Sequence, residues 1–95
     1  MEFEWDARKA TANLNKHKVN FEEAIEAFYD PFAVDDIDEV HSSNRERRFT
    51  LIGKSSIRLL IIAYTARAGD RVRIISARKT TSYEKKIYEE ANRKR

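Results

Sequence analysis

The chain has 95 residues, of which 41% are hydrophobic, 37% are charged and none is cysteine. This length supports one hydrophobic core, so we expect residues 1–95 to form a single domain. The lack of cysteine excludes disulfides and thiolate metal sites and suits a reducing cytosol. No apolar stretch reaches the ~18 residues of a membrane span, and the acidic start is unlike a signal peptide. We therefore expect a cytoplasmic protein.

The charge is distributed unevenly along the chain. Residues 1–40 carry a net charge of −7 and residues 41–95 a net charge of +10, which leaves +3 overall. A basic half of this strength can attract nucleic acid or an acidic protein surface. The alternative is that the two halves attract each other across the fold, or that the charges are simply solvated.

The first third of the chain predicts a strand and two helices. Residues 2–5 alternate polar and apolar, as a short strand does. Asp6 can cap a helix that runs to about Lys16. Asn20 can cap a second helix, whose apolar residues recur at helical spacing on one face. Pro31 ends this helix, because the residue before a proline avoids the helical region.

Four strands and a third helix follow. The expected strands are, in chain order, 32–40, 47–52, 57–65 and 71–77. The first is acidic and reads as an exposed edge strand, and the third contains a continuous apolar run that is typical of a central strand. Turns are expected over 53–56 and 68–70. Thr81 and Glu84 form a capping box for the last helix. The inner side of this helix is expected to carry Tyr83, Ile87, Tyr88 and Ala91.

The resulting order, β-α-α-β-β-β-β-α, indicates an α+β fold. The strands after residue 31 form an antiparallel meander, and the helices pack on one face of the sheet. Basic residues then gather on the other face. The candidate RNA-binding and catalytic cations are Arg47, Arg48, Arg71, Arg73, Arg78 and Lys79. The planar guanidinium makes paired, charge-assisted hydrogen bonds to phosphate.

Aromatic residues lie near these cations in the sequence. Phe49, Tyr64 and Tyr83 could stack on unpaired bases. The alternative is that the arginines form a solvated sheet face and that the aromatic rings belong to the core.

Other chemistries find little support in the sequence. There is no Walker loop, dinucleotide fingerprint or H-E-x-x-H motif. His17 and His41 would need carboxylates to complete a zinc site. Asp35, Asp36 and Asp38 are conceivable metal ligands, but an acidic edge strand explains them more simply. We expect no metal and no cofactor.

RNA cleavage needs no metal, because the 2′-hydroxyl can attack the adjacent phosphorus. The protein supplies a base, cations for the developing charge, and an acid for the leaving 5′-oxygen. Glu46 is the candidate base, with His41 as an alternative, and Arg47, Arg73 and Arg78 are the candidate charge stabilisers. Arginine stays charged and is a poor acid. The secondary catalytic candidates are Lys9, His17, Tyr64 and Tyr88. The alternative for His17 is to cap the turn between the first two helices.

Several segments resemble one known family in the right order. They are Phe3-Glu4-Trp5-Asp6, Lys16-His17-Lys18-Val19-Asn20-Phe21-Glu22-Glu23-Ala24, Asp30-Pro31, Glu46-Arg47-Arg48-Phe49, Ile52-Gly53, Tyr64-Thr65, Arg73-Ile74-Ile75-Ser76-Ala77-Arg78-Lys79, Glu84 and Tyr88. The seven-residue segment that begins at Arg73 is the most specific. On these segments the chain resembles the BrnT toxins of bacterial type II toxin–antitoxin modules.

The resemblance implies a RelE-like fold and an endoribonuclease, ribosome-linked or free, that inhibits translation. It also implies a BrnA-like antitoxin with a ribbon-helix-helix part, in a complex of two toxins and two antitoxins that binds operator DNA through the antitoxin. Two positions depart from the family. Lys18 replaces a glycine that suits a left-handed turn at a helix end. Asn20 replaces a serine and still caps.

Together these observations predict a metal-independent endoribonuclease toxin. Arg73 and Arg78 would bind the scissile phosphate, with Arg47 assisting and Glu46 as the base. Two other functions remain open from the sequence. One is a non-catalytic basic module that binds nucleic acid, and the other is a scaffold whose basic surface meets an acidic protein.

Overall fold

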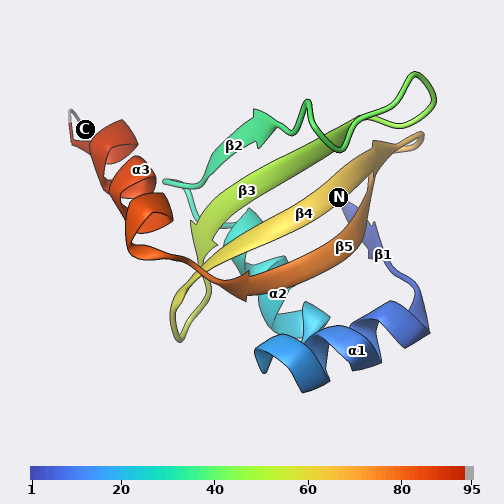
Figure 1. Ribbon diagram of the computed structural model, residues 1–95, viewed down its shortest axis with the longest axis horizontal. Coiled ribbons are helices and arrows are strands. Elements are labelled where there is room, and N and C mark those ends of the chain that lie inside the picture. Colours follow the sequence, from blue (N-terminus) through green and yellow to red (C-terminus); the bar gives the residue numbers. More distant parts are fainter. Residues whose placement is uncertain (94–95) are drawn as a thin grey trace.

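The computed structural model describes residues 1–93 and follows the predicted order of elements (Figure 1). The elements are β1 (Glu2–Glu4), α1 (Ala7–His17), α2 (Phe21–Phe28), β2 (Val34–Ile37), β3 (Arg48–Lys54), β4 (Leu59–Arg67), β5 (Arg71–Lys79) and α3 (Ser82–Asn92). The strands form one sheet in the order β1-β5-β4-β3-β2. Strands β2 to β5 are the predicted antiparallel meander, and β1 adds to β5 in parallel. The predicted α+β fold is confirmed.

The helix starts are set by the predicted capping residues. The Asp6 side chain accepts hydrogen bonds from the backbone amides two and three residues on, at 2.8 and 3.1 Å. The Asn20 side chain accepts from the amide of Glu23 at 2.7 Å. Thr81 and Glu84 form both bonds of the capping box. Each cap satisfies amides that the helix itself leaves unpaired, so short-range sequence signals fix all three starts.

Helix α2 covers one face of the sheet and forms the core with it, while α1 runs along the edge of the sheet beside β5. Fully buried side chains there include Phe21, Leu60, Ile62 and Ile74. Figure 1 shows α2 behind the middle strands and α1 along β5, while α3 stands beside the end of the sheet near β2 and β3. The opposite side of the sheet, which we call the open face, is therefore left without a covering helix over most of its length. None of the helices in residues 1–93 is long and apolar enough to cross a membrane.

Strand β3 is longer than predicted and absorbs half of an expected turn. It runs to Lys54, so Gly53 lies inside the strand, and the chain turns over the next four residues. A Cβ atom on Gly53 would lie 2.6 Å from the carbonyl oxygen of Ala27 at the end of α2. The glycine therefore lets α2 approach the sheet closely, which is a packing role rather than a turn role.

Asn13 joins α1 to the free edge of β5. Because β1 pairs only with residues 71–73, the rest of that edge has no neighbouring strand. The buried Asn13 amide takes the strand's place: it donates to the Ala77 carbonyl at 2.8 Å and accepts from the Ala77 amide at 3.1 Å. The same amide donates to the Val19 carbonyl at 2.9 Å. These bonds fix the position of α1 beside β5.

Lys18 adopts the left-handed backbone conformation that is expected where the family has glycine. Its φ and ψ angles are 60° and 32°, and its amide donates to the Leu14 carbonyl to close α1. Only glycine adopts this conformation without a steric cost. The Lys18 carbonyl accepts a hydrogen bond from Arg58 at 2.8 Å, which helps to hold the turn.

Candidate functional site

A bulge in β5 reverses the side-chain alternation at the middle of the strand. The residues on either side of Ile75 pair with Ala63 and Tyr64, which are adjacent in β4. Ile75 is therefore an extra residue without a partner of its own. Such bulges re-aim the side chains that follow them.

The bulge places Arg73 and Arg78 on the same face. Residues five apart in a regular strand point to opposite sides. Here Arg73 pairs with Thr65 and Arg78 with Ile61, and these partners are four residues apart in β4. Both arginines therefore lie on the open face, but about 13 Å apart at ~3.3 Å per strand residue.

Five arginines share the open face by their register in the sheet. They are Arg48, Arg67, Arg71, Arg73 and Arg78. Sequence reasoning missed Arg67, because β4 extends two residues beyond its predicted end. Two predicted cations lie elsewhere. Arg47 is exposed just before β3, where alternation puts it on the other side from Arg48, and Lys79 pairs with the core residue Leu60 at the exposed end of β5.

Glu46 lies between two of these arginines. Its carboxylate accepts from Arg48 Nε at 3.4 Å and from Arg67 Nη2 at 3.3 Å. Arg67 Nε also donates to the hydroxyl of Thr65, a residue that is only 1% exposed. The Glu46 side chain itself is 38% exposed, so the carboxylate is held on the surface rather than buried.

Glu4 of β1 brings in two more arginines. Arg73 Nη1 lies 2.9 Å from one oxygen of Glu4, and Arg71 Nη1 lies 3.5 Å from the other. The hydrogen bond from Arg73 lowers the pKa of the Glu4 carboxyl. Thr65 pairs with both Arg48 and Arg73 across the sheet, so the two groups are neighbours. We call them together the arginine corner: Glu4, Glu46, Arg48, Arg67, Arg71 and Arg73.

Arg78 stands apart from this corner and is firmly paired. Its two terminal nitrogens donate to the two oxygens of Glu84, each at 2.8 Å. This hydrogen bonding raises the pKa of Arg78 and lowers that of Glu84. Glu84 also forms the capping box of α3. The pair therefore fastens α3 to the end of β5, and the structure does not bring Arg78 to the same point as Arg73.

Lys9 and His17 line a small pocket at the edge of β5 that faces α1. The pocket has a volume of about 230 Å³ and lies between α1 and the bulge, with Lys16, Ile75 and Ser76 also in its wall. Because Ile75 and Ser76 follow Arg73 by two and three residues, this basic pocket adjoins the strand that carries the arginine corner. The two secondary candidates from α1 thus line one pocket beside β5.

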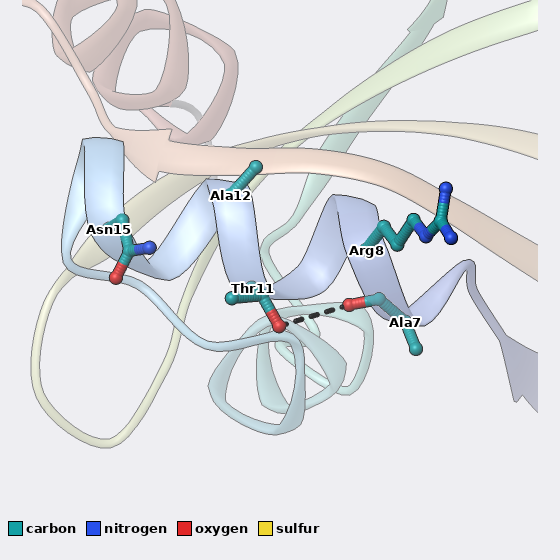
Figure 2. A pocket seen from close by; sticks show the side chains of 5 residues that line it. All are labelled: Ala7, Arg8, Thr11, Ala12 and Asn15. Carbon is teal, nitrogen blue, oxygen red and sulfur yellow. Dashed lines mark hydrogen bonds between the residues drawn. The ribbon is translucent and has the colours of Figure 1, made fainter.

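A wider and shallower hollow runs along α1 (Figure 2). Ala7, Thr11 and Asn15 lie in its wall together with Arg8 and Ala12. The Thr11 hydroxyl donates to the Ala7 carbonyl at 3.2 Å, so it is used within the helix. This hollow gathers no set of side chains suited to catalysis.

The two tyrosines predicted as secondary catalytic candidates lie away from the arginine corner. Tyr64 is on the covered face, where its hydroxyl donates to Asp35 at 3.0 Å and burial raises the pKa of its phenol. Tyr88, the buried residue of α3, donates a hydrogen bond to Asp30 at 2.7 Å. Both hydroxyls hold structural elements together. The sequence does not reveal this placement of Tyr64, because the continuous apolar run of β4 hides the side of the sheet to which each residue points.

The acidic edge strand spreads its carboxylates in different directions. Asp35 points to the covered face and Asp36, its neighbour in β2, to the open face. Asp38 binds the ring of His41 at 2.8 Å in the loop before β3. His41 is thereby held by Asp38, and Glu46 is the candidate base that contacts open-face arginines. No three histidine or carboxylate side chains within residues 1–93 are grouped to hold a metal ion.

The fold and this site define a class of protein. The antiparallel meander with its three helices is consistent with a RelE-like α+β fold, and its uncovered face carries arginines that are bridged by two carboxylates. Residues 5–84 match the family described as "Ribonuclease toxin, BrnT, of type II toxin-antitoxin system". The chain belongs to this family, whose members are ribonucleases paired with antitoxins.

A solved structure supports the fold. The chain is similar to the crystal structure of the Brucella abortus ribonuclease toxin BrnT, with a TM-score of 0.58 and 18% sequence identity. The match covers 86% of this chain and 99% of the Brucella chain. No curated protein sequence matches the chain. The predicted family is therefore confirmed, and the solved structure supports the predicted α+β fold.

Proposed function

We propose that residues 1–95 form one toxin domain that cleaves RNA without a metal ion and so stops translation in the cytoplasm. The observation that carries this proposal is the arginine corner, where four guanidinium groups and two carboxylates meet on the open face. Cations held on an uncovered sheet face can bind a sugar–phosphate backbone, and one carboxylate among them can move a proton.

Glu46 acts as the base in this proposal. It takes the proton of a 2′-hydroxyl, whose oxygen then bonds to the adjacent phosphorus while the bond from phosphorus to the 5′-oxygen breaks. The products are a 2′,3′-cyclic phosphate and a free 5′-hydroxyl. Arg48, Arg67 and Arg73 stabilise the negative charge that develops on the phosphoryl oxygens. The 5′-oxygen takes a proton, for which Lys9 and His17 beside β5 are the candidates.

The ion pairs of the corner are weak enough to yield to RNA. Both contacts of Glu46 exceed 3.2 Å, and the pairs are partly exposed. Exposed pairs of this kind contribute about 0–1 kcal/mol. A phosphate offers paired, charge-assisted hydrogen bonds to the same guanidiniums. In bound RNA, a phosphate would therefore replace Glu46 as the hydrogen-bond partner of Arg48 and Arg67, and the Glu46 carboxylate would be available to the 2′-hydroxyl.

Arg78 has a different part in the proposal. Its bidentate pair with Glu84 fixes α3 at the end of the open face, so it positions the helix rather than the reacting phosphate. Arg71 lies at the edge of the corner and extends the RNA-binding surface. Arg47 and Lys79 lie off the open face and are expected to contribute only to the overall attraction of the polyanion.

The partner is proposed to be a BrnA-like antitoxin with a ribbon-helix-helix part. Two copies of each chain would assemble, and the complex would bind operator DNA through the antitoxin. The support for a partner is the family itself, which is defined as part of a type II toxin–antitoxin system. The genomic test is direct: a short reading frame for a ribbon-helix-helix protein should lie immediately downstream.

The cleavage proposal is tested with the purified chain and a labelled RNA, with and without a chelator. We expect cleavage that resists the chelator and leaves 2′,3′-cyclic phosphate ends. Glu46→Gln should lose most of this activity while the protein remains folded. Salt-sensitive binding with no cleaved product would contradict the proposal and favour the non-catalytic nucleic-acid-binding module.

A further inference from the structure

A pocket lies between α3 and the open face of the sheet. Its volume is about 210 Å³. It is lined by four aliphatic residues, Val34, Ile52, Ile61 and Ile87, together with Asp36, Thr50, Tyr83 and Glu84. Ile61 is the register partner of Arg78, so the pocket begins where the row of arginines ends.

Two residues of α3 that the sequence places toward the core remain in solvent here. The side chain of Tyr83 is 74% exposed and that of Ile87 is 38% exposed, whereas Tyr88 is buried. The pairs of Arg78 with Glu84 and of Tyr88 with Asp30 hold the helix at this distance from the sheet. An aromatic ring is thus held at the mouth of an apolar pocket without closing it.

We propose that this pocket binds an unpaired nucleobase of the RNA whose phosphate lies in the arginine corner. The inference rests on the proposed function and adds a specificity site to it. The arginine corner and the pocket share one uncovered sheet face. The corner lies beside Thr65, the partner of Arg73, and the pocket is lined by Ile61, four residues earlier on β4. A short stretch of single-stranded RNA laid along the face would reach both. Tyr83 would stack on the base, as aromatic side chains do in single-strand recognition.

The charge of the pocket favours a base over a phosphate. The two charged residues that line the pocket, Asp36 and Glu84, are both acidic, and both carboxylate oxygens of Glu84 already accept hydrogen bonds from Arg78. One oxygen of Asp36 accepts from the amide of Ile37, and the other has no hydrogen-bond partner within residues 1–93. A carboxylate repels phosphate and accepts from N–H groups. Guanine presents two adjacent donors, N1–H and its exocyclic amino group, so we assign it as the preferred base.

Binding of an RNA that cannot be cleaved tests this independently of catalysis. The probes are two short single-stranded 2′-O-methyl RNAs that differ only by guanine or uracil at one position, and the measurements are calorimetric Kd values and NMR shifts of the Tyr83 ring. We expect tighter binding of the guanine probe. Tyr83→Ala should weaken it by about 5- to 160-fold, the range for loss of one stacked base. Tyr83→Phe should retain binding, and Asp36→Asn should abolish the guanine preference.

The matched control is Ile57→Ala, which removes another exposed apolar side chain, in the turn between β3 and β4. Unchanged RNA binding by Tyr83→Ala would overturn the inference. So would a variant that loses affinity for the antitoxin alone, because the pocket would then be a protein-docking site. Cleavage by the wild type without any base preference overturns the inference and leaves the proposed function standing. Base-dependent binding without cleavage would support the inference and contradict the proposed function.

Discussion

Replacing Arg78 with alanine should loosen α3 and destabilise the protein, whereas the same change at Arg73 should not. Arg78 makes two 2.8 Å charge-assisted bonds to Glu84, whose side chain is 15% exposed. Hydrogen bonds to charged groups contribute about 1.5–3 kcal/mol each when they are buried. The Arg78 side chain is 40% exposed, which reduces the expected total to about 1–2 kcal/mol.

This loss is measurable for a chain of this size. A change of about 1 kcal/mol shifts Tm by roughly 4–8 °C in a domain of under 100 residues. Urea and thermal denaturation, followed by circular dichroism, give the free energy of unfolding. Hydrogen exchange should show that the amides of α3 lose protection in Arg78→Ala before those of β4 do.

Arg73→Ala is the matched control, because it removes the same group from the same strand and face. Arg73 makes a single bond to Glu4 on the short strand β1, so its loss should cost less than about 0.5 kcal/mol. Equal destabilisation by the two variants, or none by Arg78→Ala, would refute the division of the arginines into a helix anchor and an RNA-binding group.

Three further predictions concern stability. Asn13→Ala should cost about 2–4 kcal/mol in urea denaturation, because it leaves the buried amide and carbonyl of Ala77 unpaired; a loss below about 1 kcal/mol would contradict this. Lys18→Gly should raise the free energy of unfolding by about 0.5–1 kcal/mol, since glycine relieves the left-handed conformation; a decrease would show that the Lys18 side chain matters more. The hydrogen bonds from Arg58 lower the pKa of Glu23 below its ordinary 4.5, so this contribution is present at neutral pH and is lost as the pH falls below about 4.5; Glu23→Gln should flatten that part of the pH–stability curve, and an unchanged curve would be inconsistent with it.

Local sequence signals predicted the framework of the fold. Helix starts depend on contacts within four residues, so Asp6, Asn20 and Thr81 could be identified as caps from spacing alone. The continuous apolar run of β4 predicted the central strand, and β4 does lie in the middle of the sheet, although its open-face residues Ile61 and Ala63 are only half-buried. These elements needed no knowledge of distant parts of the chain.

The candidate site depends on pairing, which local patterns do not reveal. Nothing in the segment after Arg73 marks Ile75 as an extra residue, since neither glycine nor proline is present there. Strict alternation would therefore separate Arg73 and Arg78, although the structure places them on one face. Glu4 joins the arginine corner only because β1 pairs in parallel with β5. Three residues of strand carry too little information to predict such a partner.

The pairing register of the strands decides which of two adjacent residues faces the open side of the sheet. Arg47 and Arg48 are adjacent residues of the same type, so the sequence does not tell which of them faces the open side. The pairing of Arg48 with Thr65 places Arg48 on the open face. Tyr83 and Ile87 have the spacing of a buried helix face, yet the bonds of Arg78 and Tyr88 set α3 too far from the sheet to cover them. Tertiary contacts overrode the local pattern at both places.

The most direct test of the account compares two double variants that remove the same charge from different places. Arg48→Ala with Arg73→Ala removes two of the four arginines of the arginine corner, whereas Arg47→Ala with Lys79→Ala removes two cations that lie off the open face. The measurement is the rate of RNA cleavage by each folded variant at one salt concentration. Loss of one preorganised charge-stabilising donor typically costs 10²–10³ in rate. We predict at least a ~100-fold loss for the first variant and only a few-fold loss for the second; equal losses would contradict the claim that the open-face arginines perform the cleavage.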